Sequence, residues 1–298
     1  MIIIWSFSFV LVDIAVQFIS PLSLALYRFI IASVSFIIID FYLKFCRSKE
    51  KNENNNHSEK CKFSRNEWIL LILASFTGVS LFFFAQYTAI EIIGPSLPAL
   101  FVCLLAPVAI AILALILFNE KLNIQKILGF VIATFGGFLL VTGGNLETLT
   151  PTSPNFLGYL LALLTPLLWA IYSTITKKLT KNRSTNVLNK YISYLGLIEL
   201  TIFMLLNGEL IDFFTKFLNI TLLLSALYLG LGCYVLGYFV WQNSQKNLKS
   251  SKVASFLYIE PFLTLLFSAL LHRTETIVFW NIVGGVIVLV AVLIINYK

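Results

Sequence analysis

The stretch SLPALFVCLLAP, residues 96–107, decides the fold, because a related stretch, SKVASFLYIEP, occupies residues 251–261. Each copy has a proline inside an apolar run, a glutamate 13 or 14 residues later, and a glycine nine residues after that. These residues are Pro107, Glu120 and Gly129 in the first copy, and Pro261, Glu275 and Gly284 in the second. The second half of the chain therefore repeats the first at a spacing of about 155 residues.

The composition places both copies in a membrane. Of the 298 residues, 59% are hydrophobic and 12% charged, whereas soluble domains carry about 25% charged residues. A helix needs about 20 apolar residues to cross a bilayer. The sequence predicts an all-α integral membrane protein with ten transmembrane helices, at residues 2–19, 21–45, 68–90, 96–118, 124–142, 156–178, 188–207, 219–245, 251–271 and 277–297.

The basic residues predict the orientation. If the N-terminus is cytoplasmic, 18 of the 21 lysines and arginines fall in cytoplasmic segments. The positive-inside rule then places both termini in the cytoplasm of a multi-pass plasma-membrane protein. The net charge of +7 follows from this topology, so a nucleic-acid partner is excluded. The first run begins at Met1 and contains Asp13, which favours a short first span over a cleavable signal.

The repeat predicts two domains, residues 1–143 and 144–298. Since five spans is an odd number, the second copy enters the membrane from the opposite side, and the two are inverted about a pseudo-two-fold axis in the membrane plane. Secondary transporters are built this way, although a duplication kept only for packing would leave the same pattern. Residues 47–67 are polar and predict a flexible cytoplasmic linker, with a binding role as the alternative.

The chain resembles the EamA type of the drug/metabolite transporter superfamily over its whole length. The matching motifs are Trp5 near the start, Ile19-Ser20-Pro21 to Arg28, Leu105-Ala106-Pro107-Val108, and Glu120 to Gly129, while Ser6 and the surroundings of Glu275 depart from the family pattern. The resemblance implies ten spans and transport of small metabolites, often export of amino acids. It also implies a cavity lined by spans one, three, four, six, eight and nine.

Charged residues inside the spans are costly and need a partner or a water-filled cavity. Asp13 and Arg28 lie at similar depths on the first two spans, so they are expected either to form a structural ion pair or to work in transport. In the second case Arg28 docks a substrate carboxylate and Asp13 takes up a coupling proton. Glu199, in the seventh span, is interpreted as a helix-to-helix hydrogen bond in preference to a gate.

Glu260 is the strongest candidate for substrate binding or proton coupling. It lies near the midplane of the ninth span, directly before Pro261, and its repeat counterpart is Ala106. A functional site would break the symmetry of the repeat in this way, because alanine meets the needs of the scaffold in the other copy. The alternative is a permanently neutral Glu260 that is hydrogen-bonded to a neighbouring helix.

Neutral polar and aromatic residues complete the predicted lining, which would suit a zwitterionic or cationic organic solute. They are Gln86, Tyr87, Trp169, Tyr172, Trp241, Gln242 and Tyr258. Trp169 of the sixth span is the counterpart of Trp5. Taken one at a time, such residues more often serve as interfacial anchors or interhelical hydrogen bonds.

Other classes of protein find little support in the sequence. It has no nucleotide-binding P-loop, no HExxH motif and no His/Cys cluster, so no cofactor or metal is expected. A secondary transporter is the leading interpretation, ahead of a membrane scaffold or sensor and of an intramembrane enzyme. The four cysteines are expected to be inert. Small residues of the fifth and tenth spans predict tight packing within one protomer or a homodimer interface: Gly129, Ala133, Gly137, Gly284 and Gly285.

Overall fold

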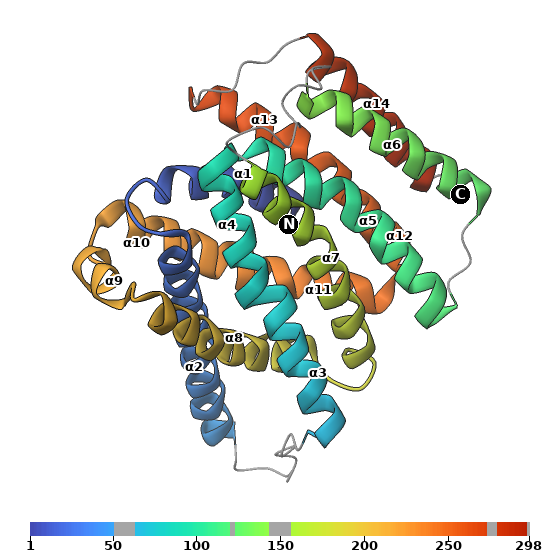
Figure 1. Cartoon of the computed structure of the whole chain (residues 1–298). Coiled ribbons are helices and arrows are strands. Elements are labelled where there is room, and N and C mark those ends of the chain that lie inside the picture. Colours follow the sequence, from blue (N-terminus) through green and yellow to red (C-terminus); the bar gives the residue numbers. More distant parts are fainter. Residues whose placement is uncertain (51–62, 120–122, 143–155, 273–278, 297–298) are drawn as a thin grey trace.

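The computed structural model describes residues 1–50, 63–119, 123–142, 156–272 and 279–296. Every regular element in these ranges is helical (Figure 1), which confirms the predicted all-α class. Seven helical stretches are long and apolar enough to cross a membrane, and the described residues contain three shorter apolar helices, Ile2–Ala15, Ile124–Leu139 and Ile282–Ile295.

Five helical rods make up the first half of the chain. They are α1 (Ile2–Ala15), α2 (Pro21–Glu50), the continuous path of α3 (Arg65–Ser75), the π-helix η1 (Phe76–Ser80) and α4 (Leu81–Ile93), then α5 (Ser96–Phe118) and α6 (Ile124–Thr142). The bounds of α5 and α6 coincide with the predicted spans, because turn or charged residues flank both apolar runs. In contrast, α1 ends four residues before the predicted boundary.

The second half follows the same order with more interruptions. It consists of α7 (Phe156–Leu179), α8 (Thr185–Asn207), α9 (Leu210–Lys216), the path α10 (Ile220–Leu227), η3 (Tyr228–Tyr238) and α11 (Phe239–Asn247), the path α12 (Ser250–Ser255), η4 (Phe256–Ile259) and α13 (Glu260–Leu270), and finally α14 (Phe279–Asn296). The short helix α9 was not predicted. The segment η3 is π-helical and η4 is a 3-10 helix.

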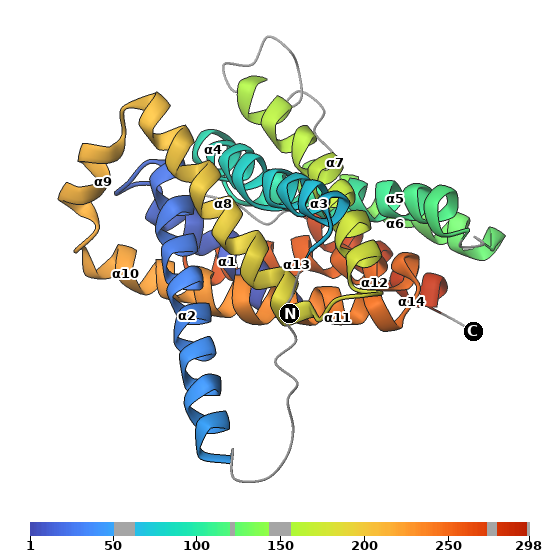
Figure 2. The ribbon, with the colours of Figure 1, turned by 90° about the horizontal axis from the view of Figure 1, so that it is seen from below.

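The predicted linker at residues 47–67 is wrong at both ends. Helix α2 continues to Glu50, beyond the bundle as seen in Figure 2. Helix α3 begins at Arg65 because Ser64 and Glu67 form a capping box, in which each side chain accepts a hydrogen bond from the other residue's backbone N–H. Residues 51–62 lie outside the described ranges.

Small residues pack α6 against α14 at one edge of the bundle (Figure 1). A Cβ at Gly129 would overlap Ile295, and one at Gly136 would overlap Ile287. The order of these contacts shows that the two helices run antiparallel. Gly129 therefore serves close packing within the protomer, and Ala133 and Gly284 are also buried. Glu120 and Glu275 lie outside the described residues.

The helices at the centre cross one another and enclose the site described below. Helix α1 packs against α13 and η3, α7 packs against α5 and α4, and α2 packs against α8. Two glycines allow close approach at these crossings: a Cβ at Gly78 of η1 would overlap the ring of Tyr172, and one at Gly237 of η3 would overlap Trp5. The π-helical segments of the third rod in each half therefore lie against aromatic residues of α7 and α1.

Candidate functional site

A buried cavity of about 50 Å³ lies where these central helices meet. A cavity needs roughly 10 to 15 Å³ to hold a water, so this one is large enough for ordered water. Helices α1, α2, α4, α5, α7, η3, η4 and α13 all contribute side chains. The lining residues are Trp5, Ser8, Phe9, Arg28, Phe82, Phe83, Gln86, Val102, Cys103, Trp169, Cys233, Tyr238, Leu257 and Glu260.

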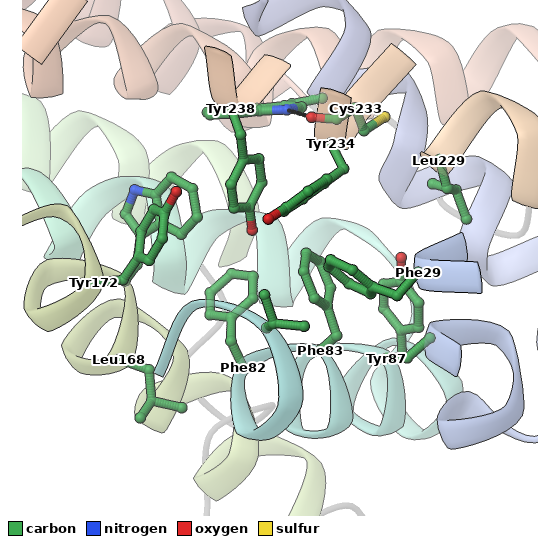
Figure 3. Packing of buried hydrophobic residues seen from close by; sticks show 14 of the residues in the cluster. Phe29, Phe82, Phe83, Tyr87, Leu168, Tyr172, Leu229, Cys233, Tyr234 and Tyr238 are labelled. Atoms are coloured by element: carbon green, nitrogen blue, oxygen red, sulfur yellow. Dashed lines mark hydrogen bonds between the residues drawn. The ribbon is translucent and has the colours of Figure 1, made fainter. Parts of the chain in front are cut away.

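Six of the fourteen lining residues are aromatic. The rings of Trp5 and Trp169 meet edge to face with centroids 5.5 Å apart, so the two repeat-related tryptophans are in contact. Trp5 Nε1 donates a hydrogen bond to the backbone oxygen of Cys233 at 3.0 Å. The buried Trp169 Nε1 has no hydrogen-bond partner among the described residues. Figure 3 shows Tyr238 of η3 pointing toward Phe82 of α4 across this region.

Arg28 reaches the cavity from α2 and is only 3% exposed. Its Nη1 donates to the Tyr87 hydroxyl at 2.6 Å, and its Cζ lies 4.0 Å from the centroid of the Phe83 ring, a favourable cation–π position. The Arg28 Nε has no hydrogen-bond partner in the part of the chain that the structure describes. In that part, the salt bridges do not include the predicted pair with Asp13, because the guanidinium turns to Tyr87 and Phe83.

Glu260 lines the same cavity from α13 and is also 3% exposed. Its Oε2 accepts a hydrogen bond from the Cys103 Sγ at 3.2 Å. The backbone around it is tied to α1, since Thr264 Oγ1 contacts the backbone oxygens of Glu260 at 3.0 Å and Ser6 at 3.2 Å. No salt bridge joins Glu260 to Arg28 within the described ranges, although both charged groups line one small cavity.

The local sequence explains why Glu260 occupies this position. The 3-10 segment η4 ends at Ile259, and α13 starts at Glu260 with Pro261 in its first turn. Proline suits a first turn because its missing N–H would have no partner there. The Glu260 backbone N–H donates to the Leu257 backbone oxygen, so the helical path continues through this residue. The counterpart Ala106 lies inside the continuous helix α5 and is buried.

Three other predicted residues form a layer next to the cavity. Gln242 Nε2 donates to the Tyr172 hydroxyl at 2.7 Å and to Asn189 Oδ1 at 2.6 Å. Trp241 Nε1 donates to the Ser173 hydroxyl at 3.2 Å. The ring of Trp169 packs at a tilt against this layer, with its centroid 5.1 Å from that of Tyr172 and 5.4 Å from that of Trp241. This layer supports the tryptophan wall from behind.

Two predicted site residues lie elsewhere. Tyr258 is fully buried but packs near the Phe130 ring, with centroids 6.3 Å apart, and it does not line the cavity. Asp13 is half-buried on α1 and also lies outside the lining. Glu199 makes the expected helix-to-helix hydrogen bonds, accepting from the hydroxyls of Ser75 at 2.7 Å and Ser80 at 2.6 Å.

Sequence reasoning missed several lining residues. The two cysteines Cys103 and Cys233 were expected to be inert, yet both line the cavity and Cys103 bonds to Glu260. A signal for Cys103 was present, since it lies four residues before Pro107 and therefore one turn away on the same helix face. Phe82 and Phe83 belong to a run of apolar residues. Such a run does not indicate which face of the helix lines a cavity.

Fold and site together define a multi-pass membrane protein with a buried polar and aromatic cavity between its helices. The EamA-like transporter family matches the chain twice, over residues 1–142 and 156–297. The chain belongs to the EamA-like transporter family and is a membrane transporter.

Curated relatives of the chain are described as transporters. An uncharacterized transporter of Archaeoglobus fulgidus is 27% identical over 298 residues, covering 99% of this chain and 94% of that protein. The uncharacterized transporter YyaM of Bacillus subtilis is 24% identical over 288 residues, covering 96% of this chain and 88% of YyaM. The chain also matches a protein crystal structure with a TM-score of 0.72 at 15% identity, covering 99% and 94% of the two chains. The last match shows likeness of fold alone.

Proposed function

We propose that this protein is a secondary transporter that moves a small zwitterionic organic solute, such as an amino acid, by alternating access. The observation that carries the proposal is the presence of Glu260 and Arg28 in one aromatic cavity without a salt bridge between them in the described residues. The solute carboxylate would bind Arg28, whose Nε lacks a partner there, and the solute amine would bind Glu260.

Two inverted halves account for the packing of the helices. The contacts of α1 with α13 and η3 have counterparts in the contacts of α7 with α5 and α4. Equivalent helices also meet each other: Ser33 of α2 and Ser193 of α8 share a hydrogen bond of 2.8 Å. The antiparallel contact of α6 and α14 fits a two-fold axis in the membrane plane. These features support ten transmembrane helices in two inverted repeats of five.

The small volume of the cavity supports alternating access. Pockets that enclose organic ligands are typically about 300 to 1,000 Å³, far above the 50 Å³ present here. In the proposed cycle a solute therefore enters only when the halves move apart. The π-helical segment η3 and the 3-10 turn before Glu260 line the cavity and are the expected flexible points, since such interruptions mark functional sites in helices.

Export and proton coupling complete the proposal. Export from a plasma-membrane protein with both termini in the cytoplasm is what the resemblance to the family implies. Proton uptake by Glu260 during the cycle would couple transport to the proton gradient, because a carboxylate must be neutral or paired when the cavity is closed to water. Cys103, which donates to Glu260, would hold the carboxylate in place between solutes.

Flux through purified protein in liposomes tests the proposal. Proteoliposomes preloaded with a labelled mixture of amino acids should release the label faster than protein-free liposomes loaded in the same way. A proton gradient across the membrane should change the rate of release. The variant Tyr258→Phe is a matched control, because it removes a buried hydroxyl outside the cavity and should transport normally. Absence of flux for all zwitterions, together with flux of inorganic ions, would contradict the proposal.

A further inference from the structure

A second cavity lies away from the central one and is lined by residues of α3, α5 and α7. Its volume is about 270 Å³, close to the lower limit of about 300 Å³ for ligand pockets. It shares no lining residue with the central cavity. Its walls are Leu70 of α3, Leu117 and Phe118 of α5, Thr174, Ile175 and Lys178 of α7, and Lys181 just after α7.

This second cavity is apolar at one end and basic at the other. Leu70, Leu117 and Ile175 form the apolar part. Lys178 lies in the last turn of α7, about 6 Å further along the axis than Thr174 at 1.5 Å per residue, and Lys181 follows the end of the helix. The basic end is therefore at the terminus of the helix, and the apolar end is deeper in the bundle.

The positive charge at the basic end is concentrated. The ammonium groups of Lys177 and Lys181 lie 5.2 Å and 5.1 Å from the centroid of the same Phe118 ring. Lys177 Nζ also donates to the Leu248 backbone oxygen at 3.3 Å and to the Ser250 hydroxyl at 2.7 Å, so the lysines that face the cavity are Lys178 and Lys181. In the part of the chain that the structure describes, no carboxylate forms a salt bridge with Lys178 or Lys181.

Neighbouring cations are arranged differently. Arg183 pairs with Glu67 at 2.8 Å, and Lys190 pairs with Asp40 at 2.8 Å. The protein thus neutralises these two basic groups with its own acids. Among the described residues, Lys178 and Lys181 instead face an apolar wall, which is the arrangement expected when the anion comes from a molecule with an apolar body.

We propose that this cavity, the α3–α5–α7 groove, binds an anionic phospholipid. The phosphate lies at Lys178 and Lys181, and an acyl chain follows Leu70, Leu117 and Ile175 toward the membrane interior. A free phosphate would leave the apolar wall uncovered. The binding uses the proposed orientation, in which these helix ends meet the cytoplasmic leaflet, where anionic lipids are attracted to basic pockets. It does not depend on transport.

An aromatic residue at the same level supports the position of the headgroup. Trp68, in the first turn of α3, is 37% exposed. Tryptophan concentrates at the level of the lipid headgroups. Leu70, which lines the groove, lies two residues further along the helix toward the membrane interior. The lysines and Trp68 therefore mark one interface, with the apolar part of the groove beneath it.

Native mass spectrometry of the full-length protein in detergent tests the site. The protein is titrated with phosphatidylglycerol or with phosphatidylcholine of the same acyl chains. The double variant Lys178→Gln/Lys181→Gln should bind the first phosphatidylglycerol about 10- to 30-fold more weakly, because each lysine near a lipid headgroup contributes about fivefold. The control Lys246→Gln/Lys249→Gln removes the same charge from two exposed lysines and should bind as the wild type does.

A third variant and two competing ligands distinguish a built lipid site from general attraction between charges. Leu117→Trp places a bulky ring in the apolar part and should weaken phosphatidylglycerol binding with the lysines intact. Leu117 is 59% exposed, so this change leaves the core unaltered. An equal loss of phosphatidylglycerol affinity in both double variants would show unspecific attraction between charges and would overturn the proposed site. Displacement of the lipid by inorganic phosphate, or equal binding of phosphatidylcholine, would also overturn it.

Discussion

Helix α5 and the path α12–η4–α13 occupy equivalent places in the sequence repeat, yet they differ in shape. Both contain the repeat proline, but α5 continues through Pro107 as one helix, whereas the second path changes to a 3-10 turn and restarts at Glu260 directly before Pro261. The proline therefore does not by itself break the helix. The second half has a cavity-lining carboxylate, Glu260, directly after the 3-10 turn, whereas the first half has a buried methyl group, Ala106, inside α5.

Replacing the carboxylate should have the largest effect on this asymmetry. Glu260→Gln keeps the size of the side chain and removes its charge, so the proposed bond to the solute amine loses the roughly 1.5 to 3 kcal/mol of a charged hydrogen bond. Transport should fall on the order of 100-fold, and the remaining flux should not vary with pH. Flux from proteoliposomes between acidic and neutral pH measures both. A normal, pH-dependent rate in a folded variant would remove Glu260 from the mechanism.

Arg28, contributed by the first half, should be the second most sensitive position. Arg28→Lys keeps the positive charge but removes the planar guanidinium. In the native protein this group donates to Tyr87 through Nη1 and has Nε available for the solute. Apparent affinity for the solute should weaken about tenfold or more, since a charged hydrogen bond contributes about 1.5 to 3 kcal/mol. The KM should rise more than kcat falls. Tyr87→Phe, which removes one hydrogen-bond partner of the guanidinium, should have a smaller effect of the same kind.

Glycines at the π-helical segments should show that both halves depend on close approach. Gly78→Ala and Gly237→Ala each push a methyl group into an aromatic ring, Tyr172 or Trp5. Each should destabilise the fold by about 1 to 3 kcal/mol, the usual cost of overpacking. A thermal unfolding assay in detergent measures the shift. Gly232→Ala is the control, because its methyl group would meet only Ile4 at 3.6 Å. An equal shift in all three would contradict the role of close approach.

The two prolines should give the smallest effects and the sharpest contrast between the halves. Pro107→Ala should leave transport unchanged. Its free energy of unfolding should stay within about 1 kcal/mol of the wild-type value or rise above it, since α5 is already continuous and gains a backbone donor. Pro261→Ala removes the residue that favours the restart of the helix and should slow transport without loss of folding. Parallel flux and unfolding measurements compare them. Equal rates in both variants would show that the break before Glu260 has no role.

The helices followed closely from the sequence. The bounds of α5 and α6 were predicted correctly, because a lipid-facing apolar run must end where charged or turn residues begin. The boundaries at residues 47–67 were wrong, because the capping box of Ser64 and Glu67 extends α3 and α2 continues to Glu50. The interruptions at η1, η3 and η4 were missed as well, since a π or 3-10 turn leaves no change in hydropathy.

Site residues could be predicted where a polar, charged or tryptophan side chain interrupts an apolar span. Gln86, Trp169, Arg28 and Glu260 were named from the sequence and line one cavity. The partners of the charged groups were not foreseen: Arg28 bonds to Tyr87 where Asp13 was expected, and Glu260 bonds to Cys103. The sequence also could not predict which apolar residues face the cavity, because both faces of a helix in a membrane are apolar.

The sequence by itself determined that the chain is helical and membrane-spanning, that its second half repeats the first, and that Glu260 breaks the repeat. These properties follow from apolar length, charge and spacing, which are local. Only the tertiary structure decided that Trp5 meets Trp169, that Arg28 and Glu260 face one small cavity, and that Lys178 and Lys181 border an apolar groove. Such contacts depend on the rotation and crossing of helices, which close packing between distant residues sets.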